Sequence, residues 1–166
     1  MYSPDINEKV TLLFEKYSDV VRRICFMYIK SNADSEDILQ EVFIKLIQTN
    51  KQFESDEHEK AWLIRVTINR CKNFNMSFWR RNVGSFDEDT PEPSTEFETK
   101  NNDILNLVLS LPPKYKDIIY LFYYEGYTAP QIAKILNKNE NTIYSGLHRA
   151  RLILKEKIGG DAHEYF

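Results

Sequence analysis

The stretch ADSEDILQEVFIKL, residues 33–46, combines carboxylates and amides with a regular apolar pattern. Its apolar residues recur at helical spacing and predict a core face made of Ile38, Leu39, Val42, Phe43, Leu46 and Ile47. A second set recurs at spacings of three, four and seven and shares another face: Asp37, Gln40, Glu41, Ile44 and Gln48. Acids and amides around one apolar side chain suit either an ordinary solvated face or a face that binds a partner.

The same stretch also raises the possibility of a metal site. Its acids lie close together at Asp34, Glu36, Asp37 and Glu41. A carboxylate site would need further ligands, and the sequence offers neither a second acidic helix nor a histidine at ligand spacing. The histidines of the chain are His58, His148 and His163, and none is paired with a nucleophile. We therefore predict no metal, no cofactor, no small-molecule substrate and no catalytic residue.

A second candidate surface lies on the helix expected at residues 59–78. Trp62, Arg65, Asn69 and Lys72 occupy one row at spacings of three and four. An aromatic ring, a guanidinium, an amide and an ammonium along one face suit unstacked bases and a phosphate backbone. The alternative is a tryptophan turned into the core beside basic residues whose stems lie along the surface.

The C-terminal half carries the spacing of a helix-turn-helix. Thr128 and Gln131 have the form of a capping box at a helix start. The small residue Ala133 is followed four residues later by Asn137, which tolerates the positive φ of a tight turn. Ile143 comes six residues after that and anchors the second helix. The sequence therefore predicts a DNA-binding motif here.

The final predicted helix adds side chains that recognise DNA. Basic residues outweigh Glu140 and Glu156 in this region and are Lys134, Lys138, Arg149, Arg151, Lys155 and Lys157. Near the helix start, four side chains are suited to base edges and phosphates: Tyr144, Ser145, His148 and Arg149. Gly146 costs about 1 kcal/mol against alanine inside a helix. It either permits a close backbone approach to DNA or is simply a poor helix residue.

These surfaces require helices to position them, and the composition supports an all-α fold. The chain has 166 residues, 42% of them hydrophobic, with only 5 glycines and a net charge of −3. Strand-like alternation is weak. Helices are expected at residues 8–30, 35–49 and 59–78, with four further helical segments in the second half.

We predict two small helical domains, residues 7–81 and 103–158, joined by a flexible acidic linker. The linker, residues 82–102, carries prolines and the acids Asp87, Glu88, Asp89, Glu92, Glu96 and Glu98. Such a segment cannot bury enough apolar surface to offset its ordering entropy.

The sequence also bounds the cellular setting. Residues 1–10 have no basic and apolar regions of the kind found in a signal peptide. No run approaches the roughly 18 apolar residues that a membrane span needs. Cys25 and Cys71 have no ligand spacing, so we expect buried reduced thiols in a cytoplasmic protein.

The order of these pieces resembles that of the extracytoplasmic-function (ECF) sigma factors of bacterial RNA polymerase. The matching pieces are DSEDILQEVFIKL, then AWLIRVTINRCKN, an acidic linker, and LPPKYKDIIYLFYYEGYTAPQIAKILNKNENTIYSGLHRARLILK. The resemblance covers nearly the whole chain. It implies a sigma region 2 in the first domain, a region 4 in the second, and transcription initiation at promoters as the function.

The resemblance also implies roles for particular residues. Asp37, Gln40, Glu41 and Ile44 would bind the β′ clamp helices of core RNA polymerase. The expected minus-10 residues are Phe53 and Asp56 in a base-binding loop and Trp62, Arg65, Val66, Thr67 and Asn69 on the next helix. Tyr144, Ser145, His148 and Arg149 would read the minus-35 element. Further expected partners are the polymerase β flap, promoter DNA and an anti-sigma factor.

The alternative is a different class of DNA-binding protein. A stand-alone helix-turn-helix regulator would use the first half as a dimerisation or ligand domain. Such a regulator would bind its operator without help, whereas a sigma factor needs core polymerase.

Overall fold

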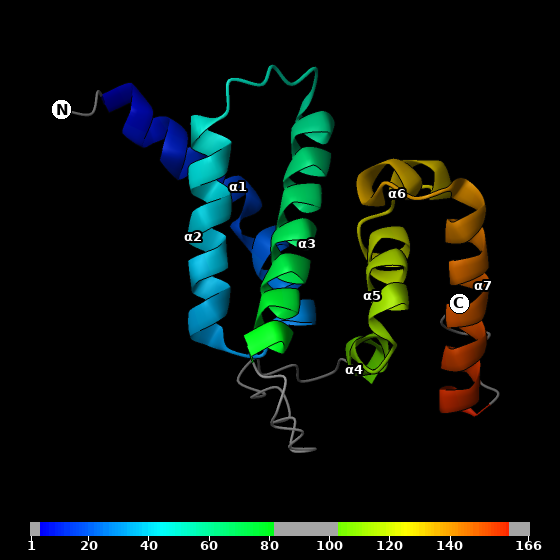
Figure 1. Cartoon of the computed structure of the whole chain (residues 1–166). Coiled ribbons are helices and arrows are strands. Elements are labelled where there is room, and N and C mark those ends of the chain that lie inside the picture. The colour runs from blue at the N-terminus through cyan, green and yellow to red at the C-terminus, as the bar shows by residue number, and fades with distance from the viewer. Residues whose placement is uncertain (1–3, 82–102, 160–166) are drawn as a thin grey trace. The chain divides into compact units, whose positions relative to one another are not determined.

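The computed structural model describes residues 4–81 and 103–159, and all regular structure in these two ranges is helical (Figure 1). The prediction of an all-α fold is therefore confirmed. The predicted linker, residues 82–102, lies outside the described residues. Within the described ranges, no helix is long and apolar enough to span a membrane.

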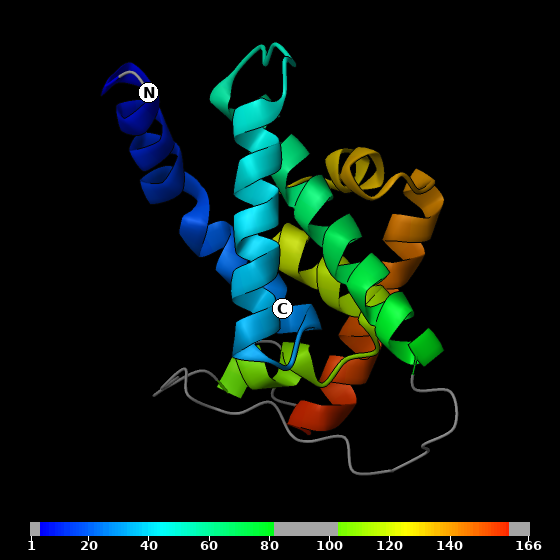
Figure 2. The same ribbon diagram turned by 60° about the vertical axis from the view of Figure 1, so that its left-hand side comes forward.

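The chain divides into two compact units, with the division between residues 96 and 97. The N-terminal unit contains α1 (Pro4–Tyr28), α2 (Asn32–Gln48) and α3 (Asp56–Arg81). Helices α2 and α3 run antiparallel, and both pack against α1 (Figures 1 and 2). The second half of α1 takes part in this packing, because its buried residues begin at Tyr17.

The core of the N-terminal unit follows the apolar stripe expected from the sequence. Five of the six residues predicted on the core face of α2 are buried: Ile38, Leu39, Val42, Phe43 and Leu46. They pack against residues of the other two helices, among them Tyr17, Val21, Cys25, Leu63 and Cys71. Ile47 is the exception, and the prediction that it faces the core is wrong. It lies in the last turn of α2, beyond the last buried residue, and is 40% exposed.

Two serine caps set the helix starts in this unit. The Ser31 hydroxyl accepts a hydrogen bond from the Asp34 backbone N–H at 3.3 Å and begins α2 earlier than expected. The Ser55 hydroxyl accepts from the His58 backbone N–H at 3.1 Å and begins α3 at Asp56. The charged sequence after Ser55 is thus helical, and Asp56 is the first residue of a helix rather than part of a loop.

The C-terminal unit contains α4 (Asp103–Leu109), α5 (Pro113–Ile119), the π-helical turn η1 (Tyr120–Tyr124), α6 (Ala129–Leu136) and α7 (Glu140–Ile158). The long helix α7 packs against α4, α5 and α6. Its buried face includes Ile143, Leu147, Ala150 and Leu154. These residues recur at spacings of three and four, so one stripe of α7 supplies the centre of the core.

The predicted helix-turn-helix is present between α6 and α7. Thr128 and Gln131 form the expected capping box, in which the backbone N of each residue lies 2.9 and 3.4 Å, respectively, from the side-chain oxygen of the other. Asn137 ends α6 in the left-handed region at φ 52°, as the turn requires. Ala133 is 5% exposed and Ile143 is fully buried, so the close approach and the anchor are both confirmed.

Candidate nucleic-acid and protein interfaces

The mixed face of α2 is at the surface. Asp37, Gln40 and Glu41 are all exposed, and Ile44 has 51% of its side-chain surface open to solvent. Ile47, one turn further along, adds a second exposed apolar side chain. An apolar pair bordered by acids and amides is the composition of a protein-binding patch.

Glu41 is already engaged within the unit. Arg70 of α3 donates to it from Nε and, at 3.2 Å, from Nη2. The hydrogen bond from Arg70 outweighs burial and holds the pKa of the Glu41 carboxyl below its ordinary value, while the pKa of Arg70 is raised by the same bond. Sequence reasoning missed this pair, because 29 positions separate its members.

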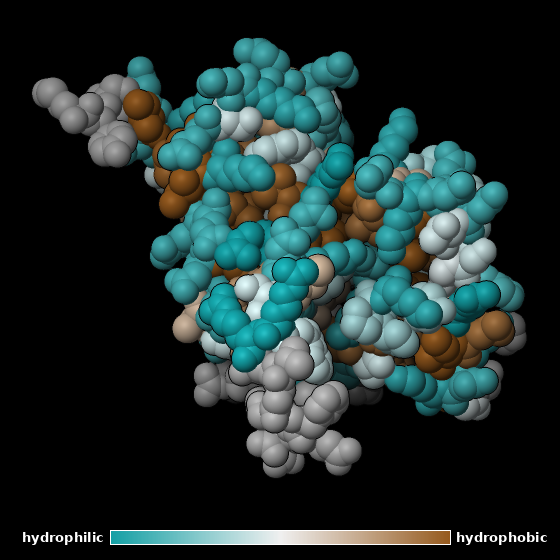
Figure 3. Space-filling view, in the orientation of Figure 1, coloured by the Kyte–Doolittle hydropathy of each residue, from teal (hydrophilic) through white to brown (hydrophobic). Residues whose placement is uncertain are grey.

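An apolar area on α1 borders α2 at Phe43, a residue of its core face. Phe14 packs its ring against that of Phe43 with the centroids 5.2 Å apart, and Arg22 lies over the Phe14 ring at 5.5 Å. Leu12 and Ile6 are 65% and 43% exposed. Figure 3 shows apolar side chains gathered along this first half of α1.

The acids around residue 36 do not gather into a metal site. In the ranges 4–81 and 103–159, no group of three or more acidic, histidine or cysteine side chains is placed to hold a metal ion. Glu36 instead lies 3.5 Å from the Arg22 guanidinium, and Glu41 is paired with Arg70. The structure therefore gives the metal interpretation no support.

The connection from α2 to α3 presents an aromatic cluster. The Phe53 ring lies 5.5 Å from the rings of both Trp62 and His58. Phe53 and Trp62 are partly buried and pack on the hydrophobic core. The His58 imidazole accepts a hydrogen bond from the Glu54 backbone N–H at 3.1 Å, which fixes the connection beside these rings.

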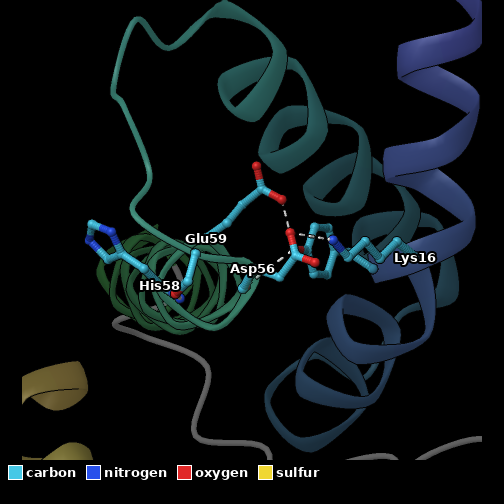
Figure 4. A network of polar contacts seen from close by, with 6 residues as sticks. Lys16, Asp56, His58 and Glu59 are labelled. Carbon is cyan, nitrogen blue, oxygen red and sulfur yellow. Dashed lines mark hydrogen bonds and ion pairs between the residues drawn. The ribbon is translucent and has the colours of Figure 1, made fainter.

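A polar network holds the start of α3 against α1 (Figure 4). The Lys16 ammonium lies 2.9 Å from the Asp56 carboxylate, and the Tyr17 hydroxyl donates to Glu59 at 2.7 Å. Asp56, predicted to meet a base, is thus within an ion pair, although its side chain is 80% exposed.

The row on α3 is a mixture of exposed and half-buried side chains. Arg65 and Asn69 are exposed, whereas Trp62 and Val66 are partly buried against the core. The Trp62 ring packs against the core while part of it reaches the surface, so the inward packing of the alternative interpretation is present and the base-binding role stays a prediction. Thr67 is fully buried, and its hydroxyl donates to the Leu63 carbonyl at 2.7 Å. Its burial is at odds with a role in contacting DNA, so we leave it out of the candidate surface.

The first turns of α7 present the expected recognition residues. Tyr144 is 54% exposed, and Ser145, His148 and Arg149 are exposed as well. Burial acts to raise the pKa of the Tyr115 phenol, but hydrogen bonds from Arg149 and Lys114 outweigh it and lower that pKa. Arg149 of α7 is therefore near the Tyr115 phenol of α5.

Neither interpretation of Gly146 agrees with the structure. Gly146 is buried, and a Cβ atom at this position would lie 2.8 Å from Ile118 Cδ1. The glycine therefore allows α7 to approach α5 inside the unit rather than DNA outside it. Its position in the sequence gave no sign of this, because the contact is between residues 28 positions apart.

Two of the basic residues counted in the C-terminal half make contacts within the unit. Arg151 Nε donates to the Tyr123 hydroxyl at 2.7 Å, and its guanidinium lies over the Phe122 ring at 5.5 Å. Lys157 donates to the Ser110 hydroxyl at 2.6 Å. The basic surface available near Tyr144 is thus smaller than the residue count suggests.

Comparison with protein families identifies two regions in the chain. The family model described as Sigma-70 region 2 matches residues 13–84, and the model described as Sigma-70, region 4 matches residues 101–154. Together they span well over half of the chain.

Several curated proteins are similar over most of their length. The ECF RNA polymerase sigma-E factor of Haemophilus influenzae is 28% identical over 163 residues, which cover 89% of this chain and 86% of that protein. The RNA polymerase sigma factor SigV of Bacillus subtilis is 27% identical over 139 residues, covering 82% of each chain. The ECF sigma factor SigX of the same organism is 24% identical, covering 92% of this chain and 85% of its own.

Two solved structures share the fold. The sigma factor RpoE of Bartonella quintana, in complex with the anti-sigma factor NepR, has a TM-score of 0.71 at 21% identity and covers 96% of this chain and 99% of its own. CnrH, in complex with the cytosolic domain of CnrY, has a TM-score of 0.63 at 16% identity, covering 93% and 90%. At these identities the likeness is one of fold alone.

Proposed function

This chain belongs to the ECF-type RNA polymerase sigma factors, which act without enzymatic activity in transcription initiation, and we propose that its two units divide promoter recognition between them. Region 2 would span residues 7–81 and region 4 residues 103–158, with residues 82–102 as the acidic linker. The family membership decides against a stand-alone helix-turn-helix regulator. Because the function is exercised on polymerase, we expect the chain to work in the cytoplasm.

The mixed face of α2 is proposed to dock on the β′ clamp helices of core polymerase. Asp37 and Gln40 would meet basic and polar groups of the partner, and Ile44 with Ile47 would be covered on binding. Burying these two exposed apolar side chains removes surface from water, which favours association. Glu41 would contribute while held by Arg70.

The surface from the Phe53 connection along α3 is proposed to act on the minus-10 element. Phe53 and Trp62 lie together beside the start of α3, where an unstacked base can meet aromatic rings. Asp56, the first residue of α3, is a further proposed contact, although its carboxylate is turned toward Lys16 (Figure 4). Arg65 and Asn69 extend that surface, and Val66 supports it from the core side. Capturing a flipped base offsets the few kcal/mol of unpairing, so opening is favoured where the base fits.

The first turns of α7 are proposed to enter the major groove at the minus-35 element. Tyr144, Ser145, His148 and Arg149 are exposed there, and a recognition helix reads base edges with such residues. Arg149 would make the bidentate contact to a guanine that is the commonest specific arginine contact.

Further partners follow from the family. RpoE of Bartonella quintana was solved bound to the anti-sigma factor NepR, and we propose that an anti-sigma factor also controls this chain. The polymerase β flap is the proposed partner of region 4. The acidic linker would pass through polymerase, where its charge could mimic nucleic acid.

The observation that carries the proposal is the presence of a region 2 match and a region 4 match in order on one chain. In vitro transcription with core polymerase on genomic fragments, with start sites mapped, tests it. We expect specific starts only when the chain is added, and little binding of the free chain to duplex DNA. Tight binding of the chain alone to an operator, without new start sites, would contradict the proposal.

A further inference from the structure

The two cysteines of the chain face each other across the core of the N-terminal unit. Cys25 comes from α1 and Cys71 from α3, and both side chains are buried. The Cys71 thiol donates to the Cys25 sulfur, with the two sulfur atoms 3.9 Å apart. Both thiols are free, and both belong to the hydrophobic cluster of this unit. Two thiols in contact from separate helices are placed to react with each other as well as to pack.

A second contact, one turn further along, holds the same two helices together. Asn75 follows Cys71 by four positions, and Tyr28 follows Cys25 by three. The Asn75 side-chain amide donates to the Tyr28 carbonyl at 3.0 Å, so α1 and α3 lie side by side over this turn. A disulfide requires sulfur atoms about 2.05 Å apart. The movement from 3.9 Å to that distance falls to side-chain rotation and a small shift of the α1 end.

The closed pair is protected, so its oxidation needs a local opening. The hydrogen bond with Cys25, and then burial, raises the pKa of the Cys71 thiol and keeps it in its unreactive neutral form. Cys25 lies in the last turn of α1, which ends at Tyr28, and the Ile29 backbone N–H donates to the Cys25 carbonyl at 2.8 Å. The terminal turn of a helix opens more readily than its middle. Opening of this turn therefore exposes Cys25 while α3 stays folded.

We propose that Cys25 and Cys71 form a reversible oxidation site, whose oxidant is a hydroperoxide that reaches Cys25 when the last turn of α1 opens. The Cys25 thiolate attacks a peroxide oxygen, the O–O bond breaks, and a sulfenic acid forms. Cys71 then attacks the sulfenic sulfur, the S–O bond breaks, and water leaves as the disulfide forms. With hydrogen peroxide, two electrons pass from the sulfur atoms to the oxidant, and the two thiol protons end in the two water molecules produced.

The neighbouring thiol decides the product of oxidation. A sulfenic acid without a partner proceeds to a sulfinic acid, which thiols do not reverse. Cys71 lies in contact with Cys25, so disulfide formation is intramolecular and is faster than attack by a second molecule of oxidant. The disulfide closes a loop over 46 sequence positions and ties α1 to α3. Exposure to an oxidant thus produces a crosslink that stabilises the unit and that a dithiol reverses.

Peptide mapping of the purified full chain tests the site, and it does not depend on the proposed function. The native chain is treated with hydrogen peroxide, remaining thiols are alkylated in denaturant, and the chain is digested with trypsin. We expect residues 24–30 to be released in disulfide linkage with residues 71–72, because Arg or Lys bounds both peptides. Dithiothreitol before alkylation should remove the link. Oxygen added to either cysteine, disulfides between two chains, or two unmodified thiols would each overturn the proposal.

Thermal unfolding measures the effect of the crosslink. Both tryptophans, Trp62 and Trp79, lie in region 2, so tryptophan fluorescence follows this unit. The midpoint of the oxidised chain should lie roughly 10 °C or more above that of the reduced chain, because the disulfide restricts the unfolded state. Dithiothreitol should return it to the reduced value. An unchanged or lower midpoint after disulfide formation would overturn the stabilising role.

Two substitutions on α3 test the route by which the oxidant enters. Asn75→Ala removes the bond to Tyr28 and should speed disulfide formation about fivefold, because one hydrogen bond fewer holds the α1 end closed. Asn73→Ala is the matched control, since Asn73 is exposed on the same helix, and it should react at the wild-type rate. Equal rates for the two variants would overturn the route. Circular dichroism checks that both variants fold, and the peptide map of the wild-type chain decides the site itself.

Discussion

The two units present their candidate contact residues in different ways. In region 4, Tyr144, Ser145 and His148 are exposed on a helix whose start is set by the Asn139 cap and the Asn137 turn. In region 2, Glu41 is paired with Arg70, Asp56 with Lys16, and Phe53 with Trp62. Region 4 is a preformed surface, while region 2 uses side chains that already stabilise its own fold.

This contrast reflects what each unit has to do on binding. Duplex DNA offers its major groove without rearrangement, so a preformed helix can bind as it stands. To bind a flipped base, region 2 must give up contacts between its own side chains, such as the contact of Phe53 with Trp62. We therefore expect substitutions of Phe53, Asp56 or Glu41 to change stability and binding together, and substitutions of Tyr144, Ser145 or His148 to change binding alone.

The largest expected effect is on the alkylation rate of the two cysteine thiols, which both lie in region 2. Cys71 and Cys25 are buried, and their sulfur atoms are 3.9 Å apart. The hydrogen bond with Cys25, and then burial, raises the pKa of the Cys71 thiol, which disfavours the reactive thiolate. Alkylation of the reduced native chain should be slower than that of the unfolded chain by a factor on the order of 1,000. Rapid alkylation in native buffer would show that region 2 opens readily.

A charge change on the α2 face should have the next largest effect. Gln40→Lys with Ile44→Lys places two cations on the proposed polymerase surface and removes its exposed apolar centre. We expect core polymerase binding to fall by about 30-fold or more, as for a hot spot of about 2 kcal/mol. Pull-down with core polymerase measures it, and Asn73→Lys, which adds a cation at an exposed position of α3 outside the proposed polymerase surface, is the control. Glu41→Lys is a poorer test of the surface, because it would also remove the ion pair with Arg70 and place two cations side by side. Undiminished binding of the double variant would exclude this face.

The turn of region 4 should be sensitive to side-chain branching. Asn137→Val puts a β-branched residue at φ 52° and should cost about 1–2 kcal/mol, whereas Asn137→Gly should be tolerated. Both tryptophans of the chain, Trp62 and Trp79, lie in region 2. The loss should therefore appear in the circular dichroism transition and leave the tryptophan fluorescence transition unchanged. A matching shift of both transitions would mean that the units unfold together.

Substitutions at the contact between Gly146 and Ile118 should change the free energy of unfolding by a smaller amount. Gly146→Ala gains about 1 kcal/mol of helix propensity but overpacks the core at a cost of about 1–3 kcal/mol. Ile118→Val removes the Cδ1 atom that the new methyl group would meet. We expect the double variant to be more stable than additivity of the two single changes predicts, by about 1 kcal/mol. Additive free energies of unfolding would show that the two side chains do not compete for space.

The smallest effect is expected for the Glu41–Arg70 pair. Because Arg70 lowers the pKa of Glu41 in the folded state, the stabilisation is present above pH 4.5 and is lost as the pH falls through the folded-state pKa. The side chains are 50% and 36% exposed, so the contribution is about 0.2–1 kcal/mol. Urea unfolding of wild type and Glu41→Gln at pH 7 and at pH 3.5 measures it. A stability difference that grows toward low pH would contradict the sign.

Local sequence patterns were sufficient to predict the helices and the class of protein. The apolar stripe of α2, the capping box at Thr128 and the turn at Asn137 each depend on residues within a few positions of one another. Their physics is that of one helix or one turn, so the sequence alone determines it. The order of the region 2 and region 4 motifs likewise identified the family without any knowledge of the packing.

The roles of single side chains were decided by contacts across the fold. Thr67 and Ile47 stand where helical spacing allows either face, and only the position of the neighbouring helices buries one and exposes the other. Gly146 meets Ile118, and Cys25 meets Cys71, because separate helices pack together. A sequence specifies which faces a helix has, but the partner of each face depends on how the whole chain packs.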